Sequence, residues 1–340
     1  MRQHLFHRKK EINTFFTEDG ERIERETEIR FDPLTRESSR LVVDPGLKLS
    51  IPDYTDVADQ TGGKNCPFCP DNVHQLTPRF PEEITDDGRI TQGEAVVAPN
   101  LFPYSKHNGV VVMSKAHYLH LDDFTVEMIQ NAFVAAQKYI QNVMKHEPHE
   151  SFVSINWNYL PYSGGSILHP HLHVIVSESP TNEQRMFEQS NQSFRAKHGE
   201  HYLDFLYKHE FHEKERWIGE HGHVAWMHAF APKSHNDYLA IFRKKSKVYD
   251  ISAEDWKHFA TGLKQIFTTL NEQQMASFNM SLTFQHDGSP AYARLIPRIT
   301  LGQTNTSDIN FFQAMHHEPL SYKKPEDIAA LARKYFRRMS

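Results

Sequence analysis

Three histidines alternate with other residues in the segment Leu168-His-Pro-His-Leu-His-Val-Ile-Val176. Successive side chains of a β-strand point to opposite faces, so His169, His171 and His173 would share one face while the leucine and valines between them take the other. Imidazole has an ordinary pKa of about 6.5 and can act near neutral pH as a nucleophile or as an acid and base. The pattern therefore predicts a wall of reactive histidines above an apolar core. A solvated strand face in a histidine-rich chain is the alternative.

The only cysteines of the chain, Cys66 and Cys69, are separated by two residues. Such a pair supplies half of a tetrahedral zinc site and needs two further nitrogen or sulfur ligands. Because there is no second cysteine pair, we expect histidines to complete the site, and we choose His117, just past a predicted strand, and His169. A redox dithiol and two buried thiols are the alternatives.

Hydrophobic patterning predicts the elements that carry these residues. The helix expected over 123–145 has apolar residues about 3.6 positions apart, which indicates one buried face. A loop over 159–168, with glycines at 164 and 165, leads into the histidine segment. Strands are expected over 94–98, 109–114, 152–157 and 171–176.

The same order of elements recurs in the second half of the chain. Strands are expected over 223–230, 238–243, 278–284 and 291–296, and a helix over 252–270 is opened by a capping box of Ser252 and Asp255. Matching short segments lie roughly 120 residues apart, which is typical of an internal duplication. The fold class expected is α+β, with two tandem units that each consist of an antiparallel sheet and packed helices.

The expected domain organisation has three parts. Residues 1–60 form an N-terminal arm with an edge strand at 39–43. Residues 61–220 form the first unit, which carries the zinc site and the histidine wall. Residues 221–340 form a second, degenerate unit.

Composition narrows the classes of partner. The formal net charge is −5, from 38 basic and 43 acidic residues that are mixed along the 340-residue chain, so no broad cationic face for nucleic acid is expected. The sequence has no apolar run of membrane-spanning length, and its first residues lack the apolar core of a signal peptide. We therefore expect a cytoplasmic protein that binds neither nucleic acid nor membranes.

Together these residues resemble the galactose-1-phosphate uridylyltransferases, a duplicated nucleotidyltransferase branch of the histidine-triad superfamily. The resemblance extends over most of the chain, and its most specific part is the His169-Pro-His171 motif with the upstream cysteine pair. The further matching segments are Asp32-Pro-Leu-Thr, Asn100-Leu-Phe-Pro103, His117, Asn158, Ser166, Phe278-Asn-Met and Pro325-Glu-Asp.

The resemblance implies one structural zinc ion per chain and a homodimer in which the partner's second half completes each active site. Four protein ligands would leave no open position on the metal for water. The zinc ligands that the resemblance implies are Cys66, Cys69, His117 and His169.

The resemblance also implies a reaction. His171 would attack the phosphorus of a nucleotide sugar or a related pyrophosphate, and the nucleotidyl-histidine formed would pass its nucleotide to a phosphorylated acceptor. Ser166 would act beside the nucleophile as a catalytic residue. Contacts with the substrate are expected from Asn100, Asn158 and Gln313.

Several positions depart from the family. His173 stands where the transferases have a glutamine. Gln313 stands where the family has a glutamate that binds sugar hydroxyls, and Tyr292-Ala-Arg294 stands where the family's second unit often has a metal-binding His-x-His. Because imidazole can give and take a proton, we count His173 among the catalytic residues. A nucleotide pyrophosphate or dinucleoside polyphosphate hydrolase or phosphorylase is therefore the alternative enzyme. A non-catalytic nucleotide sensor is a third possibility, which the intact His171 disfavours.

Overall fold

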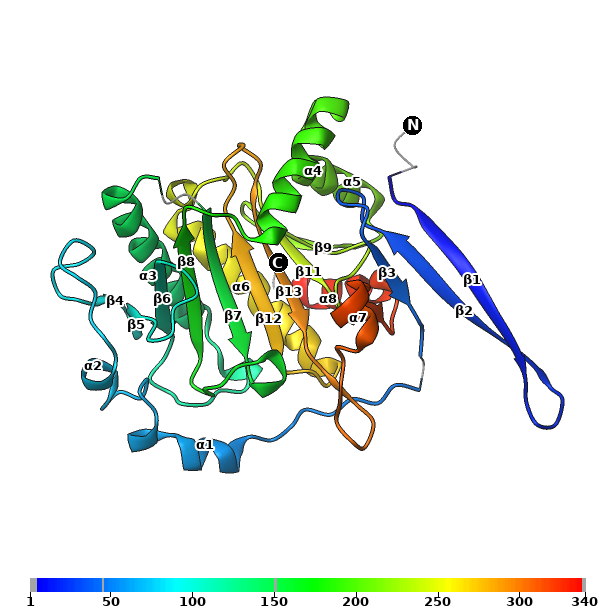
Figure 1. The fold of residues 1–340 in the computed structure, drawn as a ribbon, viewed down its shortest axis with the longest axis horizontal. Coiled ribbons are helices and arrows are strands. Elements are labelled where there is room, and N and C mark those ends of the chain that lie inside the picture. Colours follow the sequence, from blue (N-terminus) through cyan, green and yellow to red (C-terminus); the bar gives the residue numbers. More distant parts are fainter. Residues whose placement is uncertain (1–4, 45, 150–151, 338–340) are drawn as a thin grey trace.

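The computed structural model describes residues 5–44, 46–149 and 152–337 (Figure 1). Within these ranges the dominant feature is a ten-stranded antiparallel sheet, whose centre is the pairing of β7 with β12. In spatial order its strands are β4 (Ile90–Gln92), β5 (Ala95–Pro99), β6 (His107–Val112), β8 (His171–Ser177), β7 (Phe152–Tyr159), β12 (Phe278–Thr283), β13 (Ala291–Pro297), β11 (Tyr238–Phe242), β10 (Val224–His228) and β9 (Trp217–His221).

The two halves of this sheet repeat one arrangement. Each half has five strands, and a long helix connects its third and fourth strands in chain order: α3 (Val126–His146) joins β6 to β7, and α6 (Ala253–Glu272) joins β11 to β12. The second half repeats the order of the first outward from the central pair. The expected fold of two tandem α+β units is confirmed, and the two units share one continuous sheet.

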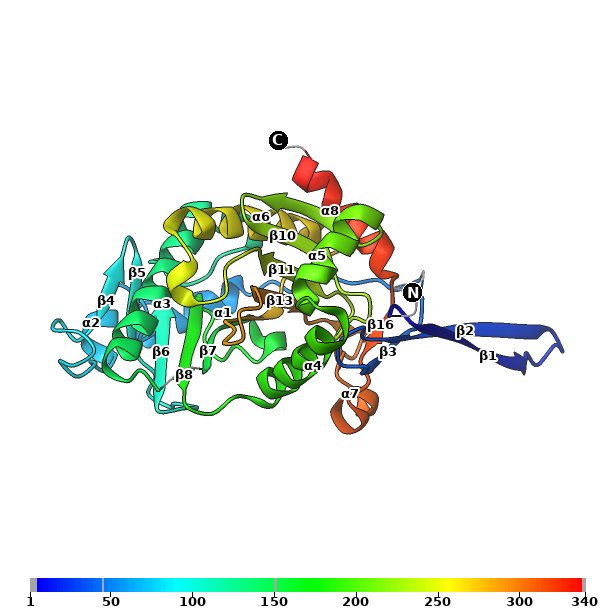
Figure 2. The ribbon, with the colours of Figure 1, turned by 90° about the horizontal axis from the view of Figure 1, so that it is seen from above.

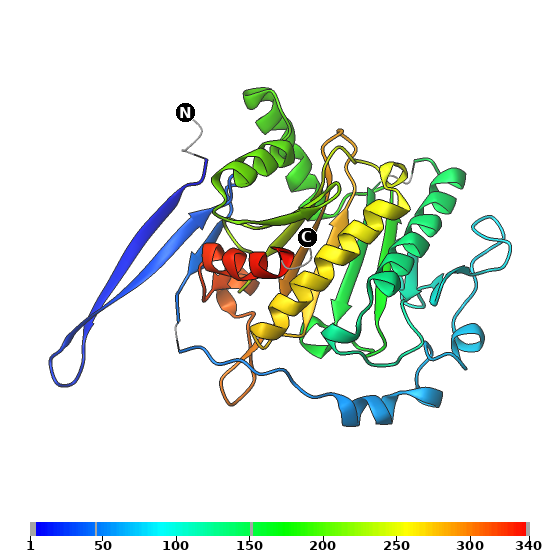
Figure 3. The same cartoon turned by 180° about the vertical axis from the view of Figure 1, so that it is seen from behind.

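Three helices cover one face of the sheet: α3, α6 and α8 (Pro325–Arg337), as Figure 3 shows. The buried stripe of α3 includes Ile129, Phe133 and Ile140 and packs into the main core with the apolar side chains of the sheet. The predicted capping box of α6 is present, with Ser252 and Asp255 each bonding the other's backbone N–H. These helices leave the opposite face of the sheet to carry polar side chains.

Helices α4 (Asn182–His198) and α5 (Tyr202–Glu213) lie on that opposite face, over the second half of the sheet. Phe187 and Leu206 form part of a separate apolar cluster with Ala225, Leu239 and Ile241 of strands β10 and β11. The predicted first unit, residues 61–220, includes both helices, but their apolar faces are buried against strands of the second unit. The predicted boundary between residues 220 and 221 falls inside β9. The division of the chain into three parts stays a prediction. The polar face of the first half stays open.

The N-terminal arm is a long hairpin that the sequence did not predict. Strands β1 (Arg8–Phe16) and β2 (Arg22–Phe31) project from the body, as Figures 1 and 2 show. Every residue of β1 is exposed, so no alternation of apolar and polar residues was needed to form it. The strand expected at an edge, observed as β3 (Ser38–Leu41), is instead an inner strand between β2 and β16 (Leu320–Ser321).

The remaining elements are short. Two of them, α1 (Thr55–Thr61) and the 3-10 turn Gly63–Asn65, lead into the cysteine pair. The others are α2 (Val73–Leu76), α7 (Phe311–His316), the strand pair β14 (Thr300–Leu301) and β15 (Thr306–Ser307), and 3-10 turns at Leu121–Asp123, Pro161–Ser163 and Val248–Asp250. In the part of the chain that the structure describes, no helix combines the length and the apolar character needed to cross a bilayer.

Candidate active site and metal centre

Strand β8 places His171 and His173 on one face, as their alternation predicted. His169 does not share that face: it lies before the strand and is fully buried beside the cysteine pair. The strand lies between β6 and β7, and its Leu172, Val174 and Val176 are fully buried in the core beneath the sheet. His171 and His173 stand on the open face, where their rings lie 5.1 Å apart between centroids. Both line a cavity of about 320 Å³, a size that suits a small-molecule ligand.

The orientation of His171 leaves one nitrogen free to react. Its Nδ1 lies 2.8 Å from the carbonyl oxygen of His169. A carbonyl can only accept, so Nδ1 carries the hydrogen and Nε2 keeps its lone pair. Burial lowers the pKa of His171 to about 4, outweighing the hydrogen bond to the His169 carbonyl, so the ring is neutral near pH 7. A neutral imidazole with its lone pair available is the form that attacks phosphorus.

His173 is held less firmly than His171. Its ring stacks on Tyr104 with centroids 5.9 Å apart, and its Nδ1 is buried without a hydrogen-bond partner among the described residues. In the described part of the chain, no hydrogen bond to the His173 ring fixes which of its nitrogens carries the proton. Burial lowers the pKa of His173, so its neutral form dominates at pH 7. Such a group can accept a proton and afterwards give it up.

The loop between β7 and β8 borders the same cavity. Gly164, Gly165 and Ser166 of this loop line the cavity, together with Asn158 near the end of β7. Gly164 has φ of +83°, a left-handed conformation that favours glycine. At Gly165 a Cβ atom would stand only 3.0 Å from the carbonyl oxygen of Leu160, so this turn depends on both glycines. The turn leaves Ser166 exposed at the cavity.

Asn100 lines the cavity from the other side, on the loop between β5 and β6. Its side-chain amide donates to Asn108 Oδ1 at 2.9 Å, and its Oδ1 accepts from the backbone of Phe102 at 3.1 Å. Asn108 also accepts from the backbone N–H of Tyr104. Asn100 therefore shapes the loop that carries Tyr104 over His173.

The four expected metal ligands converge. One ligand atom from each of the four residues lies within 4.8 Å of the others. The distance between sulfur and Nδ1 is 3.8 Å from Cys66 to His169, 3.6 Å from Cys69 to His117 and 3.8 Å from Cys69 to His169. A tetrahedral zinc ion with bonds of ~2.3 Å to sulfur and ~2.0–2.1 Å to nitrogen would separate such atoms by about 3.6 Å. The cluster fits a zinc ion in size and in donor type.

Two neighbouring oxygens orient the histidine ligands. The Nε2 of His169 lies 2.7 Å from the Ser114 carbonyl, so it donates there. The Nε2 of His117 lies 3.0 Å from the hydroxyl of Thr61, which already donates its own hydrogen to the Val57 carbonyl and must therefore accept. In both rings Nδ1 is left with a lone pair facing the cysteines. Holding the outer nitrogen in this way is how proteins fix a metal-binding tautomer.

Burial around the cluster has two consequences. It lowers the pKa of His169 to about 4, so the ring is a neutral ligand, and it raises the pKa of Cys66 to about 11, which disfavours a thiolate unless a cation is present.

Gly62 permits close approach here: a Cβ atom on it would lie 2.9 Å from the Ala58 carbonyl and 3.2 Å from the His117 ring. Phe68, between the two cysteines, contacts the rings of His169 and His171 and so connects the cluster with the cavity.

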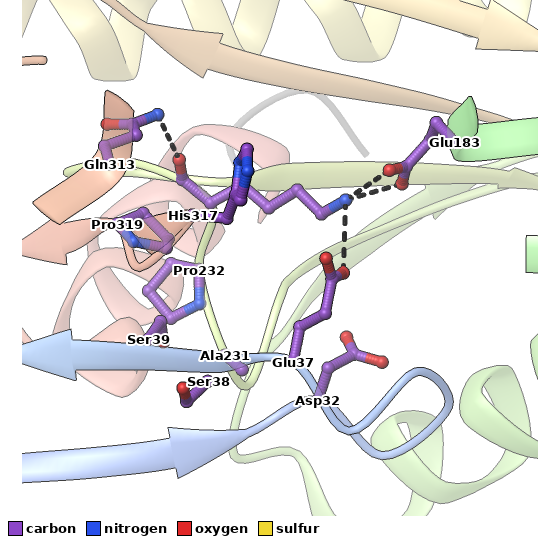
Figure 4. Close-up of a pocket in the computed structure, with 11 residues that line it drawn as sticks. Asp32, Glu37, Ser38, Ser39, Glu183, Ala231, Pro232, Gln313, His317 and Pro319 are labelled. Atoms are coloured by element: carbon purple, nitrogen blue, oxygen red, sulfur yellow. Dashed lines mark hydrogen bonds and ion pairs between the residues drawn. The ribbon is translucent and has the colours of Figure 1, made fainter. Parts of the chain in front are cut away.

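Gln313 is the one expected substrate contact that does not reach this cavity. It lies on α7 and borders a different pocket of about 230 Å³, shown in Figure 4. Its side-chain amide lies 3.4 Å from the Lys233 carbonyl, and the Lys233 ammonium is paired with Glu183 at 2.6 Å. Within one chain, Gln313 is therefore separate from the histidines.

Sequence reasoning missed the residues that support the site. Thr61, Ser114, Asn108 and Asn279 act through hydrogen bonds to ligands or lining residues. The signals available were weak, because a threonine before a glycine pair or an asparagine in a strand has many uses. Their roles depend on neighbours that the fold supplies.

Comparison with other proteins places the chain among relatives. No family model matches it. A protein of Archaeoglobus fulgidus, described as uncharacterized, is 31% identical over 312 residues, which cover 89% of this chain and 90% of that protein. The chain belongs to the same family as this archaeal protein.

Several solved structures have a fold similar to that of this chain. A GalT-like protein of Arabidopsis thaliana has a TM-score of 0.69 and 16% identity, covering 91% of this chain and 98% of its own. An ADP-glucose phosphorylase of Arabidopsis thaliana, solved with ADP-glucose bound, has a TM-score of 0.70 and 16% identity, covering 91% and 99%. A uridylyltransferase has a TM-score of 0.64 and 17% identity, covering 92% and 99%. The chain shares the fold of this GalT-like protein and of the uridylyltransferase, as its motifs led us to expect.

Proposed function

We propose that the protein is a nucleotidyltransferase that works through a nucleotidyl-histidine. One observation carries the proposal: the Nδ1–H of His171 is bonded to the His169 carbonyl, which leaves Nε2 as a lone pair in a cavity of ligand size. The substrates proposed are a nucleotide sugar, or a related pyrophosphate, and a phosphorylated acceptor. The ADP-glucose phosphorylase and the uridylyltransferase that share the fold lend support by analogy.

The reaction would proceed in two displacements. In the first, Nε2 of His171 attacks the α-phosphorus, a P–N bond forms, and the P–O bond to the leaving phosphate breaks. The positive charge that develops on the ring is stabilised by the Nδ1–H bond to the His169 carbonyl. In the second, an oxygen of the acceptor phosphate attacks the same phosphorus, and the P–N bond breaks. Asn158 and Ser166 would bind the phosphate, while Asn100 holds a loop whose residues line the cavity.

We propose that Cys66, Cys69, His117 and His169 hold one zinc ion per chain. The distances and the tautomers of the cluster support this, and four protein ligands would make the ion structural. Its chemical contribution would be to hold the two thiolates and two imidazoles together. Because His169 also supplies the carbonyl that orients His171, the metal centre would fix the nucleophile in place.

We further propose a homodimer and a cytoplasmic location. The dimer follows from the resemblance, in which the partner's second half completes the active site. It would give a role to Gln313, which lies outside the cavity of its own chain. The exposed side chains of Leu101 and Phe102, beside that cavity, offer an apolar surface that a partner would cover.

Mass spectrometry of the intact protein would test the proposal. The protein would be incubated with a panel of nucleotide sugars and dinucleoside polyphosphates and then denatured. The expected result is a mass increase of one nucleoside monophosphate, which is absent in His171→Ala and which identifies the base. No adduct with any member of the panel, under conditions where the substrate is consumed, would refute a covalent mechanism.

A hydrolase or phosphorylase of the histidine-triad type is the second candidate. The observation in its favour is His173, whose neutral imidazole lies beside His171 and whose Nδ1 has no hydrogen-bond partner within the described ranges. Labelled nucleotide supplied with and without a sugar phosphate separates the two. Transfer predominates if label accumulates in a new nucleotide sugar, and hydrolysis predominates if it accumulates as nucleoside monophosphate.

A further inference from the structure

Two asparagines face each other where the two units meet. Asn158 of β7 and Asn279 of β12 are direct partners in the register of the sheet, and the side-chain amide of Asn279 donates to Asn158 Oδ1 at 2.7 Å. An asparagine pair is ambiguous by itself, because each side chain has a donor end and an acceptor end. Which asparagine donates must be decided by other neighbours.

Two neighbours of Asn279 remove the ambiguity. Its Nδ2 also lies 2.8 Å from the backbone carbonyl of Ser163, which can only accept. Its Oδ1 lies 3.3 Å from Nη1 of Arg298, and a guanidinium can only donate. Both contacts require the same orientation of the Asn279 amide.

Arg298 is itself fixed in place. Asp308 accepts from its Nε at 2.9 Å and from its Nη2 at 2.7 Å, in the paired geometry that makes Arg–carboxylate contacts strong. The side chains of Arg298 and Asp308 are 14% and 8% exposed. The donor that faces Asn279 therefore cannot turn away without breaking a largely buried ion pair.

We propose that Arg298 and Asn279 are positioning residues that set the polarity of Asn158. Because Asn158 Oδ1 is occupied by Asn279, its Nδ2 is the end left for the cavity that holds His171. An N–H donor at that place would bind the oxygens of a substrate phosphate, whereas a carbonyl oxygen would repel them. The inference rests on the proposed function, and it assigns to the second unit a role in orienting the active site of the first.

The substitution Asn279→Asp tests this with little change in shape. The new carboxylate keeps an acceptor for Arg298 but can no longer donate, so Asn158 must turn over to bond it and would present Oδ1 to the cavity. The affinity for uridine monophosphate and for adenosine monophosphate, measured by calorimetry, is expected to fall roughly 10- to 100-fold, which is the usual cost of an unsatisfied or opposed charged contact. The rate of adduct formation is expected to fall by a similar factor. The matched control is Ser281→Ala. It removes a neighbouring hydrogen bond across the same strand pair, from Ser281 Oγ to Asn156 Oδ1 at 2.8 Å. This variant should change the affinity and the adduct rate less than about twofold.

A double-mutant cycle separates positioning from a general effect on the fold. In an Asn158→Ala background there is no amide left to orient, so Asn279→Asp should then change affinity and adduct rate less than about twofold. An equal loss in both backgrounds would show that Asn279 acts through the fold and would overturn the proposal.

Neutron diffraction from crystals of the unaltered protein provides a test that needs neither a variant nor a substrate. Deuterium atoms on the Asn158 nitrogen that faces the cavity would support the assignment, and an oxygen in that position would overturn it. Failure of the proposed function would appear differently, as the absence of an adduct in the wild-type protein whatever the orientation of Asn158.

Discussion

Only one ring nitrogen of His171, Nδ1, is bonded to the backbone, and substitution of this residue should separate the proposed chemistry from binding. His171→Ala removes the attacking nitrogen, so adduct formation should disappear and turnover should fall by at least about a thousandfold. Nucleotide affinity should change much less, because the cavity keeps its other lining residues. Rapid-quench kinetics and calorimetry measure the two effects. Turnover at the wild-type rate would rule out His171 as the nucleophile.

His173 should govern the loss of nucleotide to water. As a base toward water it must be neutral, and burial lowers its pKa below the ordinary value of about 6.5. The hydrolysis rate of the adduct should therefore be constant above pH 6.5 and decline only as the pH falls through that lowered pKa.

His173→Gln should reduce this hydrolysis by about a hundredfold or more, while transfer to the correct acceptor continues. Adduct lifetime and release of nucleoside monophosphate, followed across a pH series in both proteins, measure the effect. Equal hydrolysis in the two proteins would show that His173 is not the base.

At the scale of elements, Thr61 at the end of α1 should raise the affinity of the proposed zinc site. Thr61→Val removes the hydroxyl that accepts from His117 Nε2, and the affinity for zinc should fall about 10- to 100-fold. Thr61→Ser keeps the hydroxyl and serves as the control. Competition with a fluorescent chelator measures the affinity. If Thr61→Val and Thr61→Ser bind zinc equally well, the hydroxyl has no part in orienting His117.

At the scale of the whole molecule, a histidine in the second unit should make stability depend on pH. His228 is 1% exposed; it donates through Nδ1 to the Ala229 carbonyl and accepts at Nε2 from the Asp237 backbone. Burial lowers its pKa to about 4, whereas in the unfolded chain the pKa is about 6.5. Between these values the unfolded state binds more protons, so stability falls as the pH decreases, by up to ~1.4 kcal/mol per pH unit.

His228→Gln keeps one donor and one acceptor but does not titrate. Between pH 7 and pH 5 the wild type should lose about 1–2 kcal/mol more unfolding free energy than this variant, as measured by urea denaturation. Parallel pH dependence in the two proteins would mean that His228 is not the source of the effect.

The molecule as a whole should be a dimer whose interface includes the loop beside the cavity. Leu101, Phe102 and Tyr104 are 69%, 78% and 73% exposed there, which is unusual for side chains of this size. Multi-angle light scattering should give twice the 39.6 kDa chain mass. Phe102→Asp should weaken the dimer and lower turnover together. A monomer with full activity at nanomolar concentration would contradict the prediction.

The positions of the main candidate residues could be predicted from local sequence, because most of them lie in short segments with strict spacing. Alternation along one strand placed His171 and His173 on one face, whatever the neighbours of that strand. Because the chain has only two cysteines, Cys66 and Cys69 were interpreted together as half of a tetrahedral metal site. The two remaining coordination positions were assigned to histidines, and we chose His117 and His169. Repetition of the element order was sufficient to indicate two tandem units.

The tertiary structure decided what depends on residues far apart in the chain. Thr61 sets which nitrogen of His117 faces the cysteine pair, and Asn279, held by Arg298, occupies one end of the Asn158 side chain. Such hydrogen bonds exist only once the strand order brings the two units together. The packing of α4 and α5 on the second unit, and the position of Gln313 outside the cavity, arose in the same way. Spacing along the sequence determines which face of a strand or helix a residue occupies. Its hydrogen-bond and packing partners on that face depend on segments that only the folded chain brings close.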